Sequence, residues 1–188
     1  YENVYNLNTL SASEATAKFV QMFERGDLRP AQYFKDINEK GNYPIKKTDK
    51  TSEYKCSFRV SELYLNAAEA AAHLNKLTEA RSRLLQLMEK RYAPSGYTLK
   101  EGVVNNMDQT ELIIEILNER ARELAFEGHR WFDLCRWGIA KSTMDAYKAG
   151  ESAEAKAEMG DFIEGKHELF PIPQEEVNLG GLTQNSGY

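Results

Sequence analysis

The feature that most constrains the fold of this chain is the segment from Leu112 to Gly138, in which apolar residues recur every three or four positions. This spacing places them along one side of a helix, and that side must face a core. The apolar residues are Ile113, Ile116, Leu117, Leu124, Ala125, Trp131 and Phe132. Asp108 and Glu111 have the spacing of a capping box, and Gly138 is a typical helix stop. The pattern therefore predicts one long helix that ends at Gly138.

Charged residues are interleaved with this apolar side, so the predicted helix carries charge unusually close to the core. Besides Glu119, Arg122 and Arg136, the segment contains opposite-charge pairs spaced three residues apart. These pairs are Arg120–Glu123, Glu127–Arg130 and Arg130–Asp133. Residues at this spacing are neighbours on a helix surface and attract one another. We therefore expect ion pairs along the helix, with Arg130 and Asp133 forming a structural pair that is partly withdrawn from water.

A second clear pattern predicts a helical hairpin between Val60 and Pro94. The first helix has small and apolar residues on one side, and a second helix continues the period after a turn at residues 75–77. The residues are Val60, Leu63, Tyr64, Ala67, Ala68, Ala71 and Leu74, then Ala80, Leu84, Leu87, Met88 and Tyr92. Thr78 is predicted to cap the second helix and Pro94 to end it. The hairpin resembles one tetratricopeptide unit, whose repeat is about 34 residues, and it needs a neighbour such as the long helix to bury its faces.

Ahead of the hairpin, Ser11 and Glu14 form another capping-box pattern, and an apolar stripe predicts a helix from Ser11 to Arg25. Residues 27–57 contain prolines, a glycine and a run of charges, which predict a long irregular connection. Three tyrosines of this segment are Tyr33, Tyr43 and Tyr54. Because long connections are often functional, these tyrosines are candidates to contact a ligand. The alternative is that they close the edge of the helical core.

The remaining segments carry weaker signals. Residues 97–107 are polar, contain Gly102 and predict a loop, and residues 139–148 predict a short helix. Residues 150–165 show no firm apolar stripe, and we predict no particular element there. Residues 169–173 predict extended chain because a proline disfavours helix in the residue before it, whereas Pro173 suits the first turn of a helix. Residues 180–188 are expected to be coil.

The composition excludes several classes of function. The 188 residues are 41% hydrophobic and 28% charged, which is ordinary for one globular domain. A net charge of −5 without a cluster of lysine and arginine argues against nucleic acid as a partner. No segment approaches the roughly 18 consecutive apolar residues that cross a bilayer, and the N-terminus lacks a signal-peptide pattern. The start at Tyr1 predicts a processed or truncated product. Cys56 and Cys135 have no motif spacing, and we expect Cys135 to be a buried thiol.

The carboxylates Glu119, Glu127 and Asp133 are the candidates for acid–base catalysis, as in glycosidases, which need two carboxylates in a shared cleft. Each of them lies one helical turn from an arginine. An adjacent arginine lowers the pKa of a carboxylate, and this is the wrong direction for a general acid. We therefore assign these residues a structural role and predict no catalytic residue.

No metal site or other cofactor is predicted. His73, His129 and His167 are far apart in the sequence, and no two of them have the spacing of a helical metal-binding pair. The sequence also lacks serine-nucleophile motifs and phosphate-binding glycine loops. Trp131 and Trp137 could stack on a sugar, but they lie in or beside the apolar side of the predicted helix, which favours burial.

Two segments resemble those of a known family. The first is NERARELAFEGHRWFDLCRWG at residues 118–138, and the second is LFPIPQEEVNLGGLTQNSGY at residues 169–188. Both are similar, in the right order, to signatures of the SusD/RagB family of surface glycan-binding lipoproteins of Bacteroidetes. The chain departs from that family at Ser186, where the usual ending is Asn-Pro-Gly-Tyr, and in length, because family members are several times longer. The resemblance covers roughly residues 59–188 and implies that residues 1–188 are a single-domain C-terminal portion of a longer protein.

The resemblance also implies a function and a location. SusD-type lipoproteins lie on the outer face of the outer membrane, bind an oligosaccharide without cleaving it, and deliver it to a SusC-like TonB-dependent transporter without a cofactor. Their membrane association would come from an N-terminal lipid anchor, which we expect to lie outside this chain. The glycan-contacting residues of the family are not part of the two matched segments. Neither the ligand-binding residues nor the sugar is therefore predicted, and we expect this chain alone to bind glycans weakly or not at all.

We therefore expect an all-α fold in which a tetratricopeptide-like helical hairpin packs on a long helix, with long irregular loops. Three classes of function remain open. A non-catalytic glycan-binding protein comes first, because of the resemblance. A tetratricopeptide-like protein–protein interaction module comes second, and an enzyme comes third.

Overall fold

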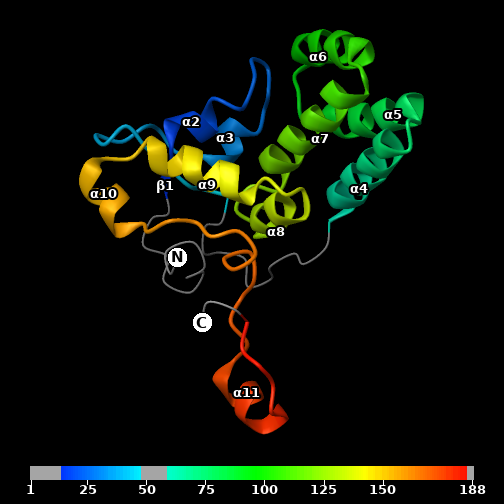
Figure 1. Cartoon of the computed structure of the whole chain (residues 1–188). Coiled ribbons are helices and arrows are strands. Elements are labelled where there is room, and N and C mark those ends of the chain that lie inside the picture. Colours follow the sequence, from blue (N-terminus) through cyan, green and yellow to red (C-terminus); the bar gives the residue numbers. More distant parts are fainter. Residues whose placement is uncertain (1–13, 48–58, 186–188) are drawn as a thin grey trace. The chain divides into compact units, whose positions relative to one another are not determined.

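The computed structural model describes residues 14–47 and 59–185 (Figure 1). The chain forms two compact units, residues 1–127 and residues 128–188. Helices make up most of the described residues, and the two named strands there are two residues long each. The predicted all-α fold class is confirmed. None of the helices in the described part of the chain is long and apolar enough to cross a membrane.

The first unit begins with short elements. Strand β1 (Glu14–Ala15) pairs antiparallel with β2 (Tyr43–Pro44), and two one-turn helices, α2 (Ala17–Val20) and α3 (Pro30–Tyr33), lie between them in the sequence. The predicted helix from Ser11 to Arg25 is therefore wrong. Thr16 caps α2 through its hydroxyl, whereas Glu14 pairs in the strand, and Ser11 lies outside the described residues. The local capping-box pattern was overridden by backbone pairing with a distant segment.

The aromatic residues of that stretch are nevertheless packed as a cluster. Phe19 and Phe23 make edge-to-face contacts with one another at 5.7 Å between ring centroids, and both contact Phe34. Tyr33 and Phe126 complete the cluster, which also contains the buried Ala15. Edge-to-face geometry suits the charge distribution of aromatic rings. The apolar stripe thus identified buried residues correctly, although it assigned them to the wrong element.

The predicted hairpin is present as α4 (Val60–His73) and α5 (Leu77–Met88). The predicted packing face of α4 is only partly correct, because Ala68 and Ala71 are buried whereas Val60, Leu63 and Leu74 are exposed. Asn75 adopts a left-handed conformation with φ of 57°, and its N–H donates to the carbonyl of Ala72 at 3.0 Å. The N–H of Lys76 donates to the carbonyl of Ala71 at 2.8 Å, which completes a Schellman motif. The helix α5 begins at Leu77 without a side-chain cap, so the prediction that Thr78 caps it is wrong.

Residues 97–107 are helical, which corrects the predicted loop. Helix α6 (Pro94–Asn106) begins at Pro94, a residue that we expected to end the preceding helix. Proline is favoured in a first helical turn because its missing N–H has no intrahelical partner there. Gly96 is required for packing, since a Cβ at this position would lie 3.0 Å from the Cα of Gly26. The glycine therefore permits a close backbone approach.

Helix α7 (Gln109–Glu123) begins with the predicted capping box. The N–H of Glu111 donates to Asp108 Oδ1, and the N–H of Asp108 donates to Glu111 Oε2, both at 2.9 Å. The predicted continuation to Gly138 is wrong. Phe126 has φ of 65° and Gly128 has φ of 85°, so the backbone leaves the helix after Glu123. A new helix, α8 (His129–Arg136), follows in the second unit.

The core of the first unit lies where α4 and α5 pack against α7 (Figure 1). Its fully buried large apolar side chains are Leu65, Leu84, Met88, Val104, Leu112 and Ile116. Burying each such side chain contributes roughly 1.5–3 kcal/mol. The predicted packing of the hairpin on a helix is confirmed. Helix α6 begins at Pro94, 34 residues after the start of α4 at Val60, and it packs on α5.

The second unit continues with α9 (Ala140–Ala149), α10 (Ala153–Glu158) and α11 (Gln174–Gly180). Gly138 ends α8 as predicted, and α9 confirms the short helix expected at residues 139–148. Residues 169–173 are non-helical and α11 follows Pro173, also as predicted. The Gln184 side chain bonds both the N–H and the carbonyl of Ile172, at 2.7 and 2.8 Å. This contact closes the loop that contains α11. Cys135 is a half-buried free thiol rather than a fully buried one, and Cys56 lies outside the described residues.

Candidate functional site

Four glutamates spaced four residues apart follow one side of α7 and the turn after it: Glu115, Glu119, Glu123 and Glu127. Side chains at this spacing are neighbours along a helix, where like charges repel. Glu119 and Glu123 are completely buried, and an unpaired charge in such a place is very costly. The row of carboxylates therefore requires a cation close to each of its members.

Arg29 binds Glu119 from a position 90 residues earlier in the chain. Its Nη1 and Nη2 donate to the two carboxylate oxygens at 2.7 and 3.1 Å, and Arg122 Nε donates to Oε2 at 2.9 Å. Arg29 also binds Asp27 through Nε and Nη2, at 2.9 and 2.7 Å. Burial by itself would lower the pKa of Arg29, but the attraction of Glu119 and the hydrogen bonds to Asp27 and Glu119 raise that pKa. The guanidinium therefore stays charged in the interior.

Glu123 is bound by three arginines. Arg91 donates to both carboxylate oxygens at 2.8 Å, Arg59 Nη1 donates to Oε1 at 3.0 Å, and Arg29 Nη1 donates to Oε2 at 3.2 Å. Burial would raise the pKa of Glu123, but the hydrogen bonds and charge of Arg91, together with the charge of Arg29, hold it far below its usual range. Glu123 is therefore an ionised carboxylate at physiological pH.

At one end of the row, Glu115 accepts hydrogen bonds from two cations. Arg122 Nη2 lies 2.6 Å from Oε1, and Lys100 Nζ lies 2.8 Å from the same oxygen. Lys100 is buried in α6 and also contacts Glu24 at 2.5 Å. This lysine explains why a segment with two glycines is ordered as a helix, because its charge pairs with α7 beneath it.

At the other end, Glu127 accepts from Arg59 Nε and Nη2 at 2.8 and 2.9 Å, and Lys47 Nζ lies 2.5 Å away. Lys47 also donates to the carbonyl of Glu123 at 2.8 Å and lies 4.1 Å from the centroid of the Tyr33 ring. Burial lowers the pKa of Lys47, and the hydrogen bond to Glu127 opposes this effect. Residues 47 and 59, which flank the segment that is not described, thus share one carboxylate.

We call this set the α7 ion network. Its carboxylates are Glu24, Asp27, Glu115, Glu119, Glu123 and Glu127, and its cations are Arg29, Lys47, Arg59, Arg91, Lys100 and Arg122. The two groups are equal in number, so the network is formally neutral. It joins residues 24–29, 47, 59 and 91 and helix α6 to α7. The glutamates recur every four residues without a break, and the arginines near them in the sequence are too few to neutralise their charge. This was the sequence signal that cations must come from more distant parts of the chain.

This geometry determines what the carboxylates can do chemically. Glu119 and Glu127 both belong to the network, whereas Asp133 lies in the second unit. A general acid needs a raised pKa, and the arginines around Glu123 shift that pKa in the opposite direction. Each network carboxylate is occupied by bonds to the protein's own cations. The arrangement is that of a structural centre.

The predicted local pairs are mostly replaced by other partners. Glu123 binds Arg29, Arg59 and Arg91 in place of Arg120, which donates to Asn66 Oδ1 at 2.6 Å. Glu127 binds Arg59 and Lys47 in place of Arg130. In the second unit the buried Asp133 accepts a hydrogen bond from Arg136 Nε at 2.9 Å. Arg130 acts on Asp133 by charge attraction, which partly offsets the lowering of the Arg130 pKa by burial.

The tryptophans and histidines do not form a binding centre in the described residues. Trp131 is half-buried and packs edge-to-face on Phe162 at 5.9 Å, and the Arg136 guanidinium lies 4.5 Å from the centroid of the half-buried Trp137 ring. The Nδ1 of His167 accepts a hydrogen bond from the N–H of Ile163. In the described ranges, no group of three or more histidine, cysteine or acidic side chains is arranged to hold a metal ion.

The tyrosines that were candidates for ligand contact are packed against the core. Tyr33 is buried, and its hydroxyl donates to the carbonyl of Glu123 at 3.3 Å. Burial is the main cause that raises the pKa of Tyr33. Tyr43 is half-buried in β2 and packs on Phe34 at 6.3 Å. Tyr33 and Tyr43 thus close the edge of the core, and Tyr54 lies outside the described residues.

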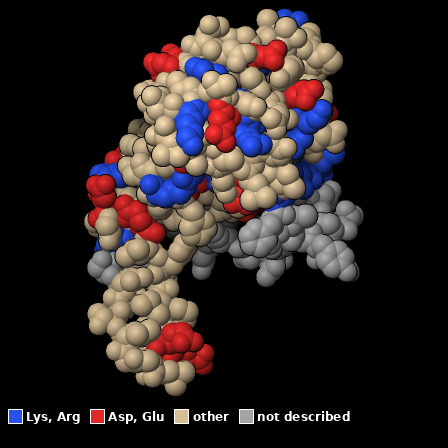
Figure 2. Space-filling model, turned by 90° about the vertical axis from the view of Figure 1, so that its right-hand side faces the viewer, with Lys and Arg blue, Asp and Glu red and all other residues tan. Residues whose placement is uncertain are grey.

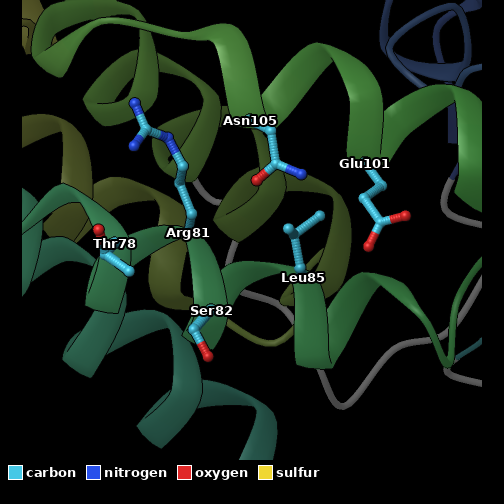
Figure 3. Close-up of a pocket in the computed structure, with 6 residues that line it drawn as sticks. All are labelled: Thr78, Arg81, Ser82, Leu85, Glu101 and Asn105. Atoms are coloured by element: carbon cyan, nitrogen blue, oxygen red, sulfur yellow. The ribbon is translucent and has the colours of Figure 1, made fainter.

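An open pocket of about 320 Å³ lies between α5 and α6 (Figure 3). Its lining residues are Thr78, Arg81, Ser82, Leu85, Glu101 and Asn105. Arg81 donates to the carbonyls of Val104 and Met107, at 3.3 and 2.5 Å, so its charge stabilises the end of α6. The lining contains no aromatic ring, which makes the pocket a poor platform for sugar stacking. Sequence reasoning missed this pocket because it assigned residues 97–107 to a loop.

An exposed pair of aromatic rings lies in the second unit. Phe132 and Phe170 are 57% and 46% exposed, and their ring centroids are 6.0 Å apart. The predicted buried stripe included Phe132, and this assignment is wrong for the described chain because α8 presents that residue to solvent. The pair joins the two sequence segments that carry the family resemblance. It can offer apolar contact to a ligand.

The surface shows no strong charge asymmetry on the face in Figure 2. Basic and acidic side chains of the described residues alternate there in small groups among uncharged ones. A nucleic-acid site would need a continuous basic surface to neutralise phosphates. This face and the net charge of −5 both argue against such a partner.

The chain is similar to several known proteins. Residues 2–188 match the model of a family described as the SusD family. SusD-like protein P25 of Formosa agariphila is 36% identical over 142 residues, which are 73% of this chain and 25% of that protein. SusD-like protein P2 of the same organism is 27% identical over 198 residues, covering 100% of this chain and 37% of that protein.

A solved structure agrees with these relatives. The crystal structure of a SusD homolog from Bacteroides thetaiotaomicron VPI-5482 superposes with a TM-score of 0.52 at 26% sequence identity. The match covers 81% of this chain and 33% of that one. The chain therefore spans only about a quarter to two fifths of the length of these proteins.

Proposed function

Because the chain belongs to the SusD family, we propose that it is the C-terminal portion of a longer, non-catalytic protein that binds glycans at the bacterial cell surface. The family match over residues 2–188 is the observation that carries this proposal. The α7 ion network supports the non-catalytic part, since its carboxylates are paired with arginines and lysines in place of a substrate.

The mechanism we propose is capture without cleavage. An oligosaccharide binds the longer protein by stacking on aromatic rings and by hydrogen bonds, and it passes to a SusC-like TonB-dependent transporter. The protein is held at the outer face of the outer membrane by an N-terminal lipid anchor. In this scheme the present chain supplies a rigid helical scaffold, and the sugar contacts lie in the remainder of the protein. No cofactor takes part.

A second candidate function is a tetratricopeptide-like protein-interaction module. The specific observation that favours it is the helical hairpin α4–α5, against which α6 packs through α5. Helical hairpins of this kind, when they stack, present continuous surfaces to a protein partner. The same scaffold could therefore serve the transporter contact within the first proposal.

Calorimetry against a panel of polysaccharides tests the proposal, with the longer gene product and the present chain measured side by side. We expect the longer protein to bind at least one polysaccharide, and this chain to bind it weakly or not at all. Reducing ends should be assayed in the same samples, and none should appear. Release of reducing sugar would show an enzyme. Tight binding by this chain alone would show that the sugar contacts are within it.

A further inference from the structure

Residues 163–167 form a single turn that is closed by two hydrogen bonds between the same two residues. The N–H of Ile163 donates to Nδ1 of His167 at 2.9 Å, and the N–H of His167 donates to the carbonyl of Ile163 at 3.0 Å. This reciprocal bonding resembles a capping box, in which a side chain accepts from the backbone at the start of a helix. The turn lies outside any helix, between the end of α10 at Glu158 and the start of α11 at Gln174. The imidazole is therefore one of the two bonds that close it.

The bond from Ile163 determines the protonation state of His167. A neutral imidazole has one nitrogen that accepts a hydrogen bond and one that carries a proton, whereas the protonated ring carries N–H groups on both nitrogens. Because Nδ1 accepts in this turn, the proton of the neutral ring lies on Nε2. A protonated ring would direct a second N–H at the N–H of Ile163, and two donors cannot form a hydrogen bond. The turn is therefore closed by the neutral form of the ring.

The turn is linked to the core of the second unit through Phe162, the residue that precedes it. Phe162 is buried and packs edge-to-face on Trp131, with 5.9 Å between ring centroids. The His167 ring also contacts Phe162, at 5.4 Å between centroids. Phe162 forms a small buried cluster with Leu134 of α8 and Ala140 of α9. A change at His167 therefore reaches this cluster directly.

Other charged groups surround the turn. Lys148 of α9 donates to Asp161 Oδ1 at 2.9 Å and to the carbonyl of Gly160 at 2.6 Å, so the chain before the turn is held independently of the imidazole. The remaining titratable groups on the segment and on the helices packed against it are Glu164, Lys166, Glu168, Lys141 of α9 and Cys135 of α8. Histidine is the side chain that ordinarily changes charge between pH 5 and 8, whereas carboxylic acids and amines ordinarily do so outside this interval. Burial raises the pKa of the Cys135 thiol, which stays neutral there.

We propose that His167 makes the turn at residues 163–167 a pH-sensitive clamp on Phe162. While the ring is neutral, it closes the turn and holds Phe162 against Trp131. When the ring takes up a proton, the bond from Ile163 is lost, the turn opens and the packing of Phe162 loosens. The clamp does not depend on glycan binding, so it can fail independently of the proposed function.

Amide hydrogen exchange, followed by NMR on the isotope-labelled chain at pH 7.5 and pH 5.5, tests the clamp. The protection factor compares each amide with an unstructured peptide at the same pH. We expect that of Ile163 to fall roughly tenfold at the lower pH, the size expected for the loss of one hydrogen bond. Nuclear Overhauser contacts between the rings of Phe162 and Trp131 should weaken over the same interval. Glu123 stays ionised there, so the buried Ile116 of the first unit should keep its protection. Equal protection of Ile163 at both pH values would overturn the proposal.

Three variants separate the imidazole from other effects of acid. His167→Gln keeps an acceptor that does not titrate, as in capping boxes that use glutamine, so Ile163 should be equally protected at both pH values. His167→Ala removes the acceptor, and protection of Ile163 should be low at both. His73→Gln replaces a 57% exposed histidine of α4 and is the matched control, which should keep the full pH dependence. If His167→Gln loses protection at pH 5.5 as the wild type does, the clamp is excluded.

The tautomer of His167 gives a readout that needs no variant. Long-range proton–nitrogen spectra of the wild type at pH 8 should show Nδ1 without a proton and Nε2 with one. Both nitrogens should carry protons at low pH, with a midpoint that coincides with the loss of protection at Ile163. A neutral ring with its proton on Nδ1 would overturn the proposal, because such a ring cannot accept from Ile163.

Discussion

Replacing Glu123 with glutamine tests whether the α7 ion network stabilises the fold. The substitution keeps the shape of the side chain and one oxygen acceptor. It removes the charge and places an amide N–H₂ group among the guanidinium groups of Arg29, Arg59 and Arg91, all of which donate to Glu123 in the native protein. The variant therefore leaves three cations short of an anion at a completely buried position.

The expected magnitude follows from the burial of those cations. Removing one partner of a buried ion pair costs roughly 3–5 kcal/mol. The side chains of Arg59 and Arg91 are 25% and 26% exposed and regain some hydration, whereas Arg29 is 3% exposed and does not. We therefore expect the lower end of the range, about 3 kcal/mol. For a chain of this length that corresponds to a decrease in melting temperature of roughly 6–12 °C.

Thermal unfolding followed by far-ultraviolet circular dichroism measures this decrease, with Glu89→Gln as the matched control. Glu89 is exposed on the surface and pairs with the exposed Lys90 at 3.1 Å. The melting temperature of Glu89→Gln should therefore equal that of the wild type. Because the network is buried, the difference between wild type and Glu123→Gln should persist in high salt. If the melting temperature of Glu123→Gln equals or exceeds that of the wild type, a stabilising role for the network is refuted.

Three further predictions concern acid stability, Asp133 and Asn75. The folded state lowers the pKa of Glu123 below its unfolded value of about 4.3, so the unfolded state binds protons more readily and stability falls as pH drops below about 5. Urea titrations at several pH values should show a shallower acid decline for Glu123→Gln than for the wild type. Asp133→Ala should cost about 1–3 kcal/mol in chemical denaturation, because Asp133 is buried but its partner Arg136 is 42% exposed. In the longer protein the folded fraction of this variant should keep its glycan affinity, and a stable variant that does not bind would contradict the structural role. Asn75→Gly should raise the free energy of unfolding by up to about 1 kcal/mol and Asn75→Ala should lower it, because φ at this position is 57° and a positive φ favours glycine. Equal melting temperatures of the two variants would exclude this effect of the backbone conformation.

Local periodicity and capping were sufficient to predict the helical hairpin and the start of α7. The helical spacing of apolar residues in α4 and α5 and the pairing of Asp108 with Glu111 all depend on residues within a few positions of one another. Such contacts are visible in a sequence. The fold class followed from them because few other segments had the alternation of a strand.

The misassigned elements were decided by contacts distant in the sequence. Apolar residues keep a helical spacing through residues 124–132, but Phe126 packs in the aromatic cluster and takes a positive φ, which ends the helix. Gly96 and Gly102 indicated a loop, yet α6 is ordered by Lys100 and by the approach of Gly96 to Gly26. Neither set of contacts can be predicted from the local sequence pattern.

The charge pairs show the same limit. Glu119 and Glu127 were interpreted as structural, and their partners were sought one turn away. They come from Arg29, Arg59 and Arg91, which precede Glu123 by 94, 64 and 32 residues. A single helix cannot reveal the cations that reach it from elsewhere, so the network itself was beyond what the sequence could predict.

The sequence separation within the α7 ion network has a consequence for the order of folding. Helices α4, α5 and α7 can form from local contacts, whereas the bond from Arg29 to Glu123 closes a loop of 94 residues. Closing a long loop lowers the chain entropy before the contacts that it brings together can form. The network should therefore assemble after helices α4, α5 and α7. Interactions that form late affect the rate of unfolding more than the rate of folding. We therefore expect Glu123→Gln to refold at nearly the native rate but to unfold much faster, so that the network sets the lifetime of the folded first unit.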